Sequence, residues 1–338
     1  MTLAALTATW GCQRRQNDVG VKAITYDRYG PPDVLRLQDV PDPVPGDGEV
    51  LIRVRAASAN ARDWHFLRGD PYVMRLQFGL HPRHPIIGSD LSGVVEATGP
   101  GVSRFRVGDE VYADVETGAF AELVCAPEDL VAAKPAHLTH EQAAAMPLAA
   151  VTALQGDRAA PGERVLVIGA AGGVGTFAVQ LAARRGAAVT AVCSGRNADL
   201  VRSLGAREAI DYTTEDPTAG DRRYDTIFQL AGTAPAGRLG RVLAPGGTLL
   251  LSSGEPRGKV FGPLGRIAWA KLTSPFTRRR VVVFAAKASA ADLDELRGLA
   301  DAGELTPVID RTYPLADTPD ALRHLETGHA RGKIVITM

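Results

Sequence analysis

The sequence is poor in cysteine and has no surplus of charge of either sign. Its 338 residues include 3 cysteines, Cys12, Cys125 and Cys193, whose wide spacing does not suggest a disulfide framework. Lys+Arg and Asp+Glu both total 38, which argues against a surface for nucleic acid or anionic membranes. The length suits about two domains with ample core. Few cysteines favour a reducing compartment, and we expect a cytoplasmic protein.

Long apolar runs are also missing. None approaches the ~18 residues that a membrane-spanning helix needs, and the longest candidate, around Ala143–Leu154, is interrupted by Pro147. We therefore expect no membrane partner. No basic residue precedes the apolar start of the chain, which argues against a signal peptide. We expect residues 1–20 to be a disordered extension, or the result of a start codon assigned too early.

A glycine-rich turn follows a short apolar run in the middle of the chain. Val165–Ile168 is typical of a buried parallel strand, and glycines follow at 169, 172, 173 and 175. Apolar residues then recur at helical spacing until Gly186. We expect Gly172, Gly173 and Val174 to contact a pyrophosphate, because glycine lets the backbone approach and the helix N-terminus offers unpaired N–H groups. A purely structural turn is the alternative.

The segments before the turn have a different pattern. Short apolar or alternating runs, separated by Pro/Gly clusters, predict a small irregular β-barrel. The expected strands are Val21–Tyr26, Val34–Leu37, Glu49–Ala56, Asp90–Thr98, Asp109–Tyr112 and Ala119–Val124. Glu141–Leu154 is expected to be helical, and strands and helices alternate after it.

Several motifs together resemble the medium-chain dehydrogenase/reductase superfamily. They are Pro85–Glu96, Gly99 to Val111, Leu148–Ala153, the turn at 170–175, Gly246-Gly247 and Gly332–Ile336. The resemblance covers about residues 21–338 and implies an α/β fold with a GroES-like β-barrel catalytic domain and an inserted Rossmann domain. We assign residues 21–140 to the first part of the catalytic domain, 141–285 to the Rossmann domain and 286–338 to the return to the catalytic domain.

The zinc ligands of that superfamily are replaced here. Zinc-dependent members have Cys in the stretch that reads Asn60–His65 in this chain, and Gly-His-Glu at Gly88-Ser89-Asp90. Asn60 and Ser89 are not competent zinc ligands, and the structural four-cysteine lobe is missing. His65, His81 and His84 form an alternative metal set, but no cysteine is nearby. We expect no metal, and the chain is most similar to the zinc-independent, quinone oxidoreductase-like branch.

Without zinc, some hydride acceptors are favoured over others. Alcohol oxidation is helped greatly by a Lewis acid, and zinc-free alcohol dehydrogenation is therefore the weaker rival. A quinone or an α,β-unsaturated carbonyl delocalises the negative charge, so modest hydrogen-bond donors suffice. We expect an NADPH-dependent reductase of such small molecules. The alternative is an NADPH-binding redox sensor or interaction protein with little turnover.

NADPH is predicted from the residues after the expected strand Ala188–Cys193. An NAD site has an acidic residue there, whereas this chain has Ser194, Gly195, Arg196 and Asn197. Arg196 is able to donate two hydrogen bonds to a 2′-phosphate, or else it is a solvated loop cation. Asn197 is expected to be the N-cap of the following helix.

The other expected cofactor residues are scattered along the chain. The resemblance places Asn60 beside the nicotinamide ribose and Tyr212, of the pair Asp211-Tyr212, near the 2′-phosphate. Ala231 and Gly232 follow an expected strand, where an open α/β sheet binds its ligand. Lys333 is either at a cofactor phosphate or exposed at a strand end. The remaining members of this set are Thr152, Ser194 and Phe284.

The proton donor has three candidates. His65 has an unperturbed pKa near 6.5, Tyr72 is a second donor with Asp63 to orient either, and bulk water is the third. The apolar passage Glu255–Arg280 is either a lid over the substrate or a surface helix, because periodicity does not separate the two. The expected strand Val281–Ala285 pairs across a dimer in many relatives, so the resemblance allows a homodimer.

Overall fold

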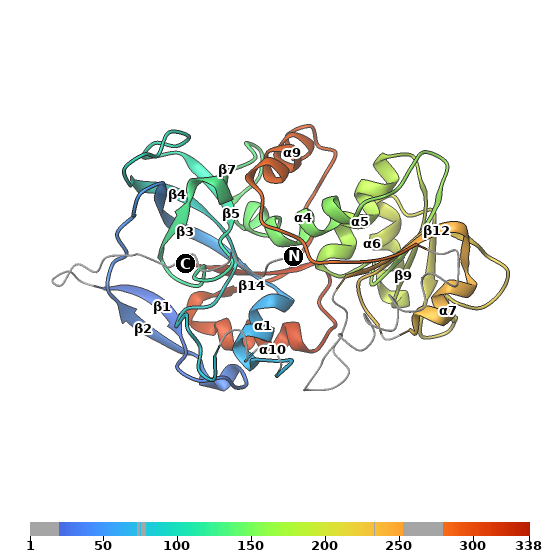
Figure 1. Ribbon diagram of the computed structural model, residues 1–338, viewed down its shortest axis with the longest axis horizontal. Helices are drawn as coiled ribbons and strands as arrows, with labels where there is room; N and C mark the ends of the chain where they lie inside the picture. The colour runs from blue at the N-terminus through green and yellow to red at the C-terminus, as the bar shows by residue number, and fades with distance from the viewer. Residues whose placement is uncertain (1–19, 73–74, 76–78, 233, 253–279) are drawn as a thin grey trace, which may run out of the picture.

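The structure is a computed structural model that describes residues 20–72, 75, 79–232, 234–252 and 280–338. Two large sheets lie next to each other along the long axis of the molecule (Figure 1). A separate antiparallel pair joins β1 (Val21–Thr25) and β2 (Arg36–Val40). No helix among the described residues is both long and apolar enough to cross a membrane.

The seven-stranded sheet is built from both ends of the chain. Its strands run in the order β14-β15-β3-β4-β5-β7, and β6 also pairs with β3. They are β3 (Glu49–Ala59), β4 (Asp90–Thr98), β5 (Glu110–Asp114), β6 (Leu123–Pro127), β7 (Val131–Ala133), β14 (Ile309–Pro314) and β15 (Lys333–Thr337). All pairs are antiparallel except β14 with β15. This sheet carries the C-terminal strand β15 beside β3.

The six-stranded sheet is parallel, in the order β10-β9-β8-β11-β12-β13. Its strands are β8 (Arg164–Ile168), β9 (Ala188–Cys193), β10 (Glu208–Asp211), β11 (Tyr224–Gln229), β12 (Leu243–Ser252) and β13 (Arg280–Phe284). The chain moves outward from β8 to β10 and then returns to the other side of β8. An open parallel sheet binds its ligand at such a switch point, here between the carboxyl ends of β8 and β11.

Helices cover the sheets and join them. They are α1 (Ala61–Arg68), α3 (His140–Ala144), α4 (Pro147–Gly156), α5 (Gly173–Arg184), α6 (Ala198–Ser203), α7 (Ala236–Arg241), α9 (Ala290–Asp301) and α10 (Thr318–Glu326). Short 3-10 turns lie at Pro32–Val34, Glu128–Leu130, Gly195–Asn197 and Leu315–Asp317. The predicted stop of α5 at Gly186 is confirmed, because this glycine has a positive φ of 82°.

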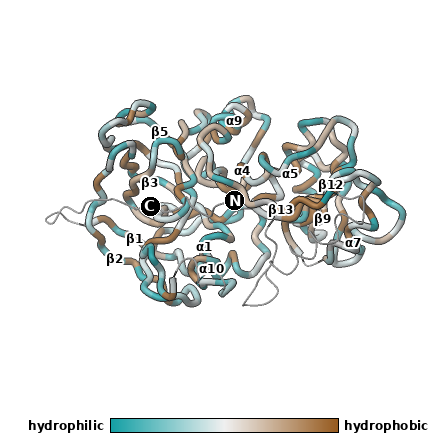
Figure 2. The backbone as a smooth tube through the Cα atoms, viewed as in Figure 1, coloured by the Kyte–Doolittle hydropathy of each residue, from teal (hydrophilic) through white to brown (hydrophobic). Residues whose placement is uncertain are grey.

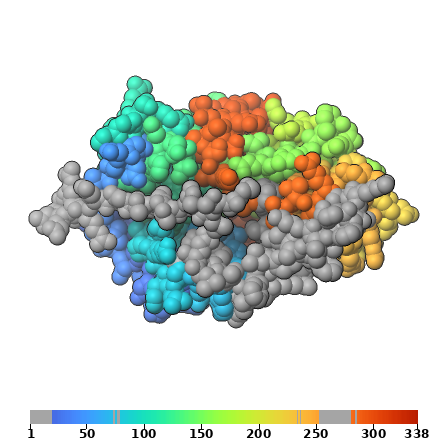
Figure 3. Space-filling view, viewed as in Figure 1, coloured from blue at the N-terminus to red at the C-terminus, as the bar shows by residue number. Residues whose placement is uncertain are grey.

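The largest hydrophobic core spans both sheets. Figure 2 shows the hydrophobic residues concentrated around β9, β12 and β13, as expected for parallel strands covered on both faces. The core under α5 includes Phe177 and Val167, and it extends to Tyr112 of β5 and Leu293 of α9. Tyr112 Oη donates to the Leu293 carbonyl at 2.6 Å, and Gln155 Nε2 donates to Asp292 at 2.6 Å. Helix α9 therefore ties the two sheets together (Figure 3).

The structure differs from three predicted elements. The single helix expected over Glu141–Leu154 is two helices, because Pro147 lacks an N–H and begins a new one. The strand expected at Val34–Leu37 is the end of a 3-10 turn and the start of β2. The strand expected at Ala119–Val124 lies later, as β6. The N–H groups of residues 119 and 120 instead donate to the carbonyls of residues 88 and 87.

Candidate functional site

The glycine turn is held tightly between β8 and the carboxyl end of β11. Gly169 has a φ of 86°, and a Cβ there would lie 2.7 Å from the Cβ of Ala231. A Cβ on Gly175 would overlap the Gly169 carbonyl oxygen. The Gly172 N–H donates to the same carbonyl at 3.1 Å. Glycine is required at 169 because of its positive φ and the neighbouring Ala231 side chain, and at 175 because neighbouring backbone fills the space of a side chain.

The start of α5 fits a pyrophosphate. Gly172 is the N-cap of this helix and has no side chain to satisfy the first N–H groups, which have no intrahelical partner. Gly173 and Val174 are the first helical residues, and α5 is 12 residues long. The N–H groups and the positive end of the helix dipole therefore face outward from the switch point of the sheet, an arrangement that suits an anionic group such as a phosphate.

The C-terminal strand touches this turn. Gly172 and Gly332 form an isolated parallel β-bridge, and the Gly332 N–H donates to the Ala171 carbonyl at 2.9 Å. A Cβ on Gly173 would lie 2.9 Å from Lys333 Cδ. The side chain of Lys333, the first residue of β15, therefore lies against Gly173, the first residue of α5.

Lys333 is buried and is not an exposed strand-end lysine. It is 3% exposed, and its Nζ donates to Asn60 Oδ1 and, at 3.3 Å, to Asp90 Oδ2. Asn60 Nδ2 in turn donates to Asp90 Oδ2 at 2.9 Å. The cause is strand register, because Ile334 of β15 pairs with Ala59 of β3 and so places Lys333 opposite Asn60. We call Lys333, Asn60 and Asp90 the Asn60 cluster.

The cluster has further partners in helices and strands. Ser58 Oγ donates to Asp90 Oδ2 at 3.2 Å, and the Leu148 N–H donates to Asp90 Oδ1 at 3.0 Å. Thr152, one turn further along α4, is buried and donates from Oγ1 to the Leu148 carbonyl at 2.6 Å. Thr152 is therefore linked to the cluster indirectly, through Leu148 in the first turn of α4.

Asp63 does not orient His65 or Tyr72, contrary to the prediction. Its carboxylate accepts from the Asn60 N–H at 2.7 Å and from Ser89 Oγ at 2.9 Å. The reason is helical geometry, because residues two apart, such as 63 and 65, do not face each other. Burial raises the pKa of Asp63 to about 7, opposed by the positive charge of Arg62 and the hydrogen bond from the Asn60 N–H.

His65 and Tyr72 have their partners outside the Asn60 cluster. The Nδ1–H of His65 donates to the Asp70 carbonyl at 2.8 Å, and its ring stacks on Trp64 with centroids 3.8 Å apart. Burial lowers the pKa of His65. Tyr72 is 42% exposed, with the Arg75 guanidinium 4.4 Å above its ring.

The residues expected at the adenosine end lie after β9 and β10. Arg196 is exposed, and its Nη2 donates to the His329 carbonyl at 3.2 Å. Tyr212 is 53% exposed directly after β10. Ser194 Oγ accepts from Asn197 Nδ2 at 3.1 Å, so Asn197 holds the N-cap position of α6 without capping it through its side chain. The prediction that Asn197 is the N-cap residue is therefore confirmed, although its side chain bonds to Ser194 and not to the helix.

The structure describes some of the remaining expected residues and not others. Ala231 and Gly232 follow β11 at the switch point, and Gly232 has a φ of 73°. Phe284 is the last residue of the edge strand β13, paired with Ser252, and its side chain is not described. The expected lid or surface helix at Glu255–Arg280 lies outside the described residues except for its last position.

Sequence reasoning missed Asp90 and the ion pair between Arg62 and Asp114. Asp90 is fully buried at the head of β4. A carboxylate at the start of a strand whose first half is buried is a signal that a buried partner exists, because an isolated buried charge is very costly. Arg62 Nη2 contacts Asp114 Oδ1. Burial raises the pKa of Asp114 to about 6, opposed by Arg62. No group of three or more His, Cys, Asp or Glu in the described part of the chain is placed to hold a metal.

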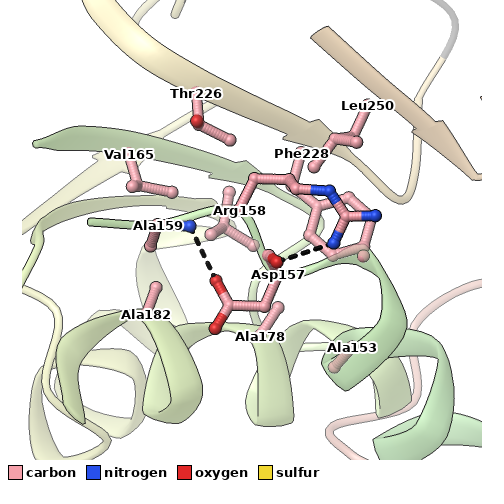
Figure 4. A pocket seen from close by; sticks show the side chains of 12 residues that line it. Ala153, Asp157, Arg158, Ala159, Val165, Ala178, Ala182, Thr226, Phe228 and Leu250 are labelled. Carbon is pink, nitrogen blue, oxygen red and sulfur yellow. Dashed lines mark hydrogen bonds between the residues drawn. The ribbon is translucent and has the colours of Figure 1, made fainter. Parts of the chain in front are cut away.

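A small cavity elsewhere is distinct from this site. It lies between α4, α5 and the first residues of β8 and β11, and most of its lining is alanine and other apolar side chains (Figure 4). Asp157 at its rim accepts from the Ala159 N–H at 3.0 Å and pairs with Arg185 at 2.6 Å. Val165 and Thr226 of its lining lie near the starts of β8 and β11, whereas the glycine turn follows the carboxyl end of β8. The cavity therefore lies toward the amino ends of the parallel strands, away from the glycine turn.

Known proteins match this chain over nearly its whole length. The model of the alcohol dehydrogenase GroES-like domain matches residues 46–136, and that of the zinc-binding dehydrogenase matches residues 204–336. A mouse (Mus musculus) protein, "NAD(P)H oxidoreductase RTN4IP1, mitochondrial", is 36% identical over 94% of this chain and 89% of its own length. The chain belongs to the medium-chain dehydrogenase/reductase superfamily.

Within this superfamily the chain falls in the quinone oxidoreductase-like branch. An Arabidopsis thaliana protein, "NADPH-dependent alkenal/one oxidoreductase, chloroplastic", is 33% identical over 94% of this chain and 79% of its own length. The solved quinone oxidoreductase from Coxiella burnetii superimposes with a TM-score of 0.82 at 31% identity, over 94% of this chain and 99% of that one. The predicted GroES-like domain and Rossmann-like parallel sheet are thus confirmed, and membership supports nicotinamide-dependent oxidoreductase chemistry.

Proposed function

We propose that this medium-chain reductase binds NADPH and transfers hydride to a quinone or an α,β-unsaturated carbonyl without a metal. The observation that carries the proposal is the contact between the glycine turn and the Asn60 cluster, made through Lys333. Relatives named as an NAD(P)H oxidoreductase and an alkenal/one oxidoreductase support the same chemistry. Bound NADPH would supply the hydride.

The chain's own residues divide the work of holding the cofactor. Gly172, Gly173 and Val174 present N–H groups to the pyrophosphate, as argued above from the start of α5. Arg196 and Tyr212, exposed after neighbouring strands, bind the 2′-phosphate that distinguishes NADPH from NADH. Asn60 holds the nicotinamide ribose at the other end.

A metal is not needed in this arrangement. The side chains at the positions of the zinc ligands are an amide and a hydroxyl, Asn60 and Ser89, joined at 3.3 Å. The ammonium of Lys333 already neutralises the neighbouring carboxylate of Asp90. A second cation beside Asn60 would be repelled by that ammonium, whereas the delocalised charge of a reduced quinone or enone needs only hydrogen-bond donors.

Water is the favoured source of the proton that completes the reduction. His65 donates its Nδ1–H to a carbonyl, which accepts only, so a neutral His65 has an Nε2 without a proton. The lowered pKa makes this neutral form dominant at pH 7. We expect His65→Gln to keep most of the turnover, measured as kcat at pH 7. A loss of a hundredfold or more would restore His65 as the donor, given the usual size of general acid catalysis.

The test of the function is NADPH oxidation followed by absorbance with a panel of quinones and enones. Turnover with at least one member of the panel supports the reductase. NADPH binding detected by fluorescence, with no turnover on any acceptor, would favour the alternative of a redox sensor or interaction protein. Absence of NADPH binding would contradict both.

Assembly and location are further parts of the proposal. Strand β13 pairs only with β12 among the described strands, and we propose that its other edge pairs with a second copy in a homodimer. Light scattering coupled to size-exclusion chromatography tests it, and a monomer at micromolar concentration would refute it. The relatives' names place them in mitochondria and chloroplasts, so cytoplasmic location stays a prediction for fractionation to test.

A further inference from the structure

Asn60 lies between a side chain that only donates and one that only accepts. The ammonium of Lys333 has three donors and no acceptor, and it contacts Asn60 Oδ1. The carboxylate of Asp90, ion-paired with Lys333, accepts from Asn60 Nδ2 at 2.9 Å. If the amide were turned over, Asn60 Nδ2 would face the donor Lys333, and Asn60 Oδ1 would face the acceptor Asp90. The amide of Asn60 is therefore fixed, with its oxygen toward Lys333.

Both amide hydrogens of Asn60 are used inside the protein. Ser89 Oγ and the Ser58 carbonyl each lie 3.3 Å from Nδ2, in addition to Asp90. The oxygen has two lone pairs, of which Lys333 uses one. What Asn60 has left for a ligand is one acceptor site, which matches a hydroxyl such as those of a ribose and does not match a carbonyl or a phosphate oxygen.

Lys333 also contacts the nucleotide turn. Its Cδ lies 2.9 Å from where a Cβ of Gly173 would be, and the preceding Gly332 bridges to Gly172. The side chain is 3% exposed, so it is covered by protein along its length. One buried side chain thus runs from the first residue of α5 to the amide of Asn60.

We propose that Lys333 is a positioning residue: it holds Asn60 Oδ1 as a hydrogen-bond acceptor for the nicotinamide ribose and couples that atom to the glycine turn. The inference rests on the proposed nicotinamide cofactor. According to this inference, Lys333 acts on the cofactor only through Asn60. Removing Lys333 should therefore change cofactor binding only in a protein that still contains Asn60.

The experiment separates this role from a structural one. Lys333→Met alone leaves the buried carboxylate of Asp90 unpaired, and we expect a lower Tm. Adding Asp90→Asn removes both charges and restores most of the Tm. In this double variant the amide at position 90 keeps its oxygen for the Leu148 N–H and presents its nitrogen to Asn60, which turns its own oxygen inward. NADPH should then bind about tenfold more weakly, by fluorescence titration, for the loss of roughly one hydrogen bond.

Two comparisons decide the outcome. Asn60→Ala in the wild-type background should weaken NADPH about tenfold, whereas Asn60→Ala added to the double variant should weaken it no further. Wild-type affinity in the double variant, with a restored Tm, would show that Lys333 is only structural. Full additivity of the two losses would show that it acts independently of Asn60.

The control removes an ion pair of the same kind at the surface. Lys22 and Asp39 are 3.2 Å apart, with side chains 54% and 67% exposed. Lys22→Met with Asp39→Asn should leave both the Tm and the NADPH affinity unchanged. A wild-type protein that fails to bind NADPH overturns the proposed function and this inference together, whereas normal wild-type binding with normal binding in the double variant overturns the inference alone.

Discussion

The backbones of Gly172 and Gly332 meet in a parallel β-bridge, although one is the N-cap of α5 and the other precedes the last strand. The bridge fixes the glycine turn of the parallel sheet against the seven-stranded sheet. Because Lys333 follows Gly332 directly, the same contact delivers its side chain to Asn60. The two parts of the candidate site are therefore joined by backbone as well as by side chains.

Replacing Gly332 by alanine should damage this junction. Gly332 has a φ of 92°, and a Cβ there would overlap the Val308 carbonyl oxygen. We expect Gly332→Ala to lower stability by more than 1 kcal/mol, measured by urea denaturation, and to weaken NADPH binding. Unchanged stability would mean that the bridge is not present in solution.

Gly298 is the matched control for that substitution. It lies within α9, and a Cβ there would meet nothing within 4 Å. Alanine has the higher helix propensity, so Gly298→Ala should stabilise the protein by about 0.5–1 kcal/mol in the same denaturation experiment. A destabilised Gly298→Ala variant would show that space at the Cβ does not predict the effect of these substitutions.

Arg196 should decide between the two nicotinamide cofactors. It is exposed after β9, and no carboxylate stands at positions 194–197 to bind a ribose hydroxyl. We expect Arg196→Ala to weaken NADPH by ~1.5–3 kcal/mol and to leave NADH nearly unchanged, compared through KM for each. Arg202→Ala, an exposed arginine of α6 paired with Asp199, is the control and should change neither. Equal losses for both cofactors would remove Arg196 from this role.

Asp63 should make stability depend on pH. Its pKa is raised to about 7 in the folded protein, whereas an unfolded aspartate titrates near 3.9. The folded state therefore binds more protons between these values, and its stability falls as pH rises from about 4 to 7 and is level above. Asp63→Asn has no such proton, and we expect it to gain stability relative to wild type across that window, by ~4 kcal/mol at most.

The measurement for Asp63 is urea denaturation at intervals between pH 4 and 8. The exposed Asp39→Asn variant is the control and should keep the wild-type pH dependence. If the difference in unfolding free energy between wild type and Asp63→Asn stays constant with pH, the carboxyl of Asp63 does not carry a raised pKa.

Chelation should leave the reductase unaffected. The proposed site contains Asn60, Ser89 and a lysine ammonium, which do not bind zinc well. After dialysis against EDTA we expect unchanged kcat with the best acceptor and less than one zinc per chain by elemental analysis. Stoichiometric zinc, whose removal abolishes turnover, would contradict the metal-free mechanism.

Local patterns made much of the fold readable from the sequence. The four apolar residues before the glycines, the helical repeat after them and the stop at Gly186 correspond to β8, α5 and its end. Strands β4 and β9 have the predicted limits. These signals depend on burial and hydrogen bonding within a few residues, which periodicity and glycine conformation encode directly.

The sequence alone therefore determined the two kinds of sheet, the glycine turn and the loss of the zinc ligands. The tertiary structure decided that Lys333 is buried, that Asp90 is its partner and that Asp63 bonds to Ser89 and Asn60. Lys333 and Asn60 are 273 residues apart and meet only because β15 pairs with β3 in one register. Shifting a strand by one residue turns its side chains to the opposite face, and nothing in the local pattern specifies that register between distant strands.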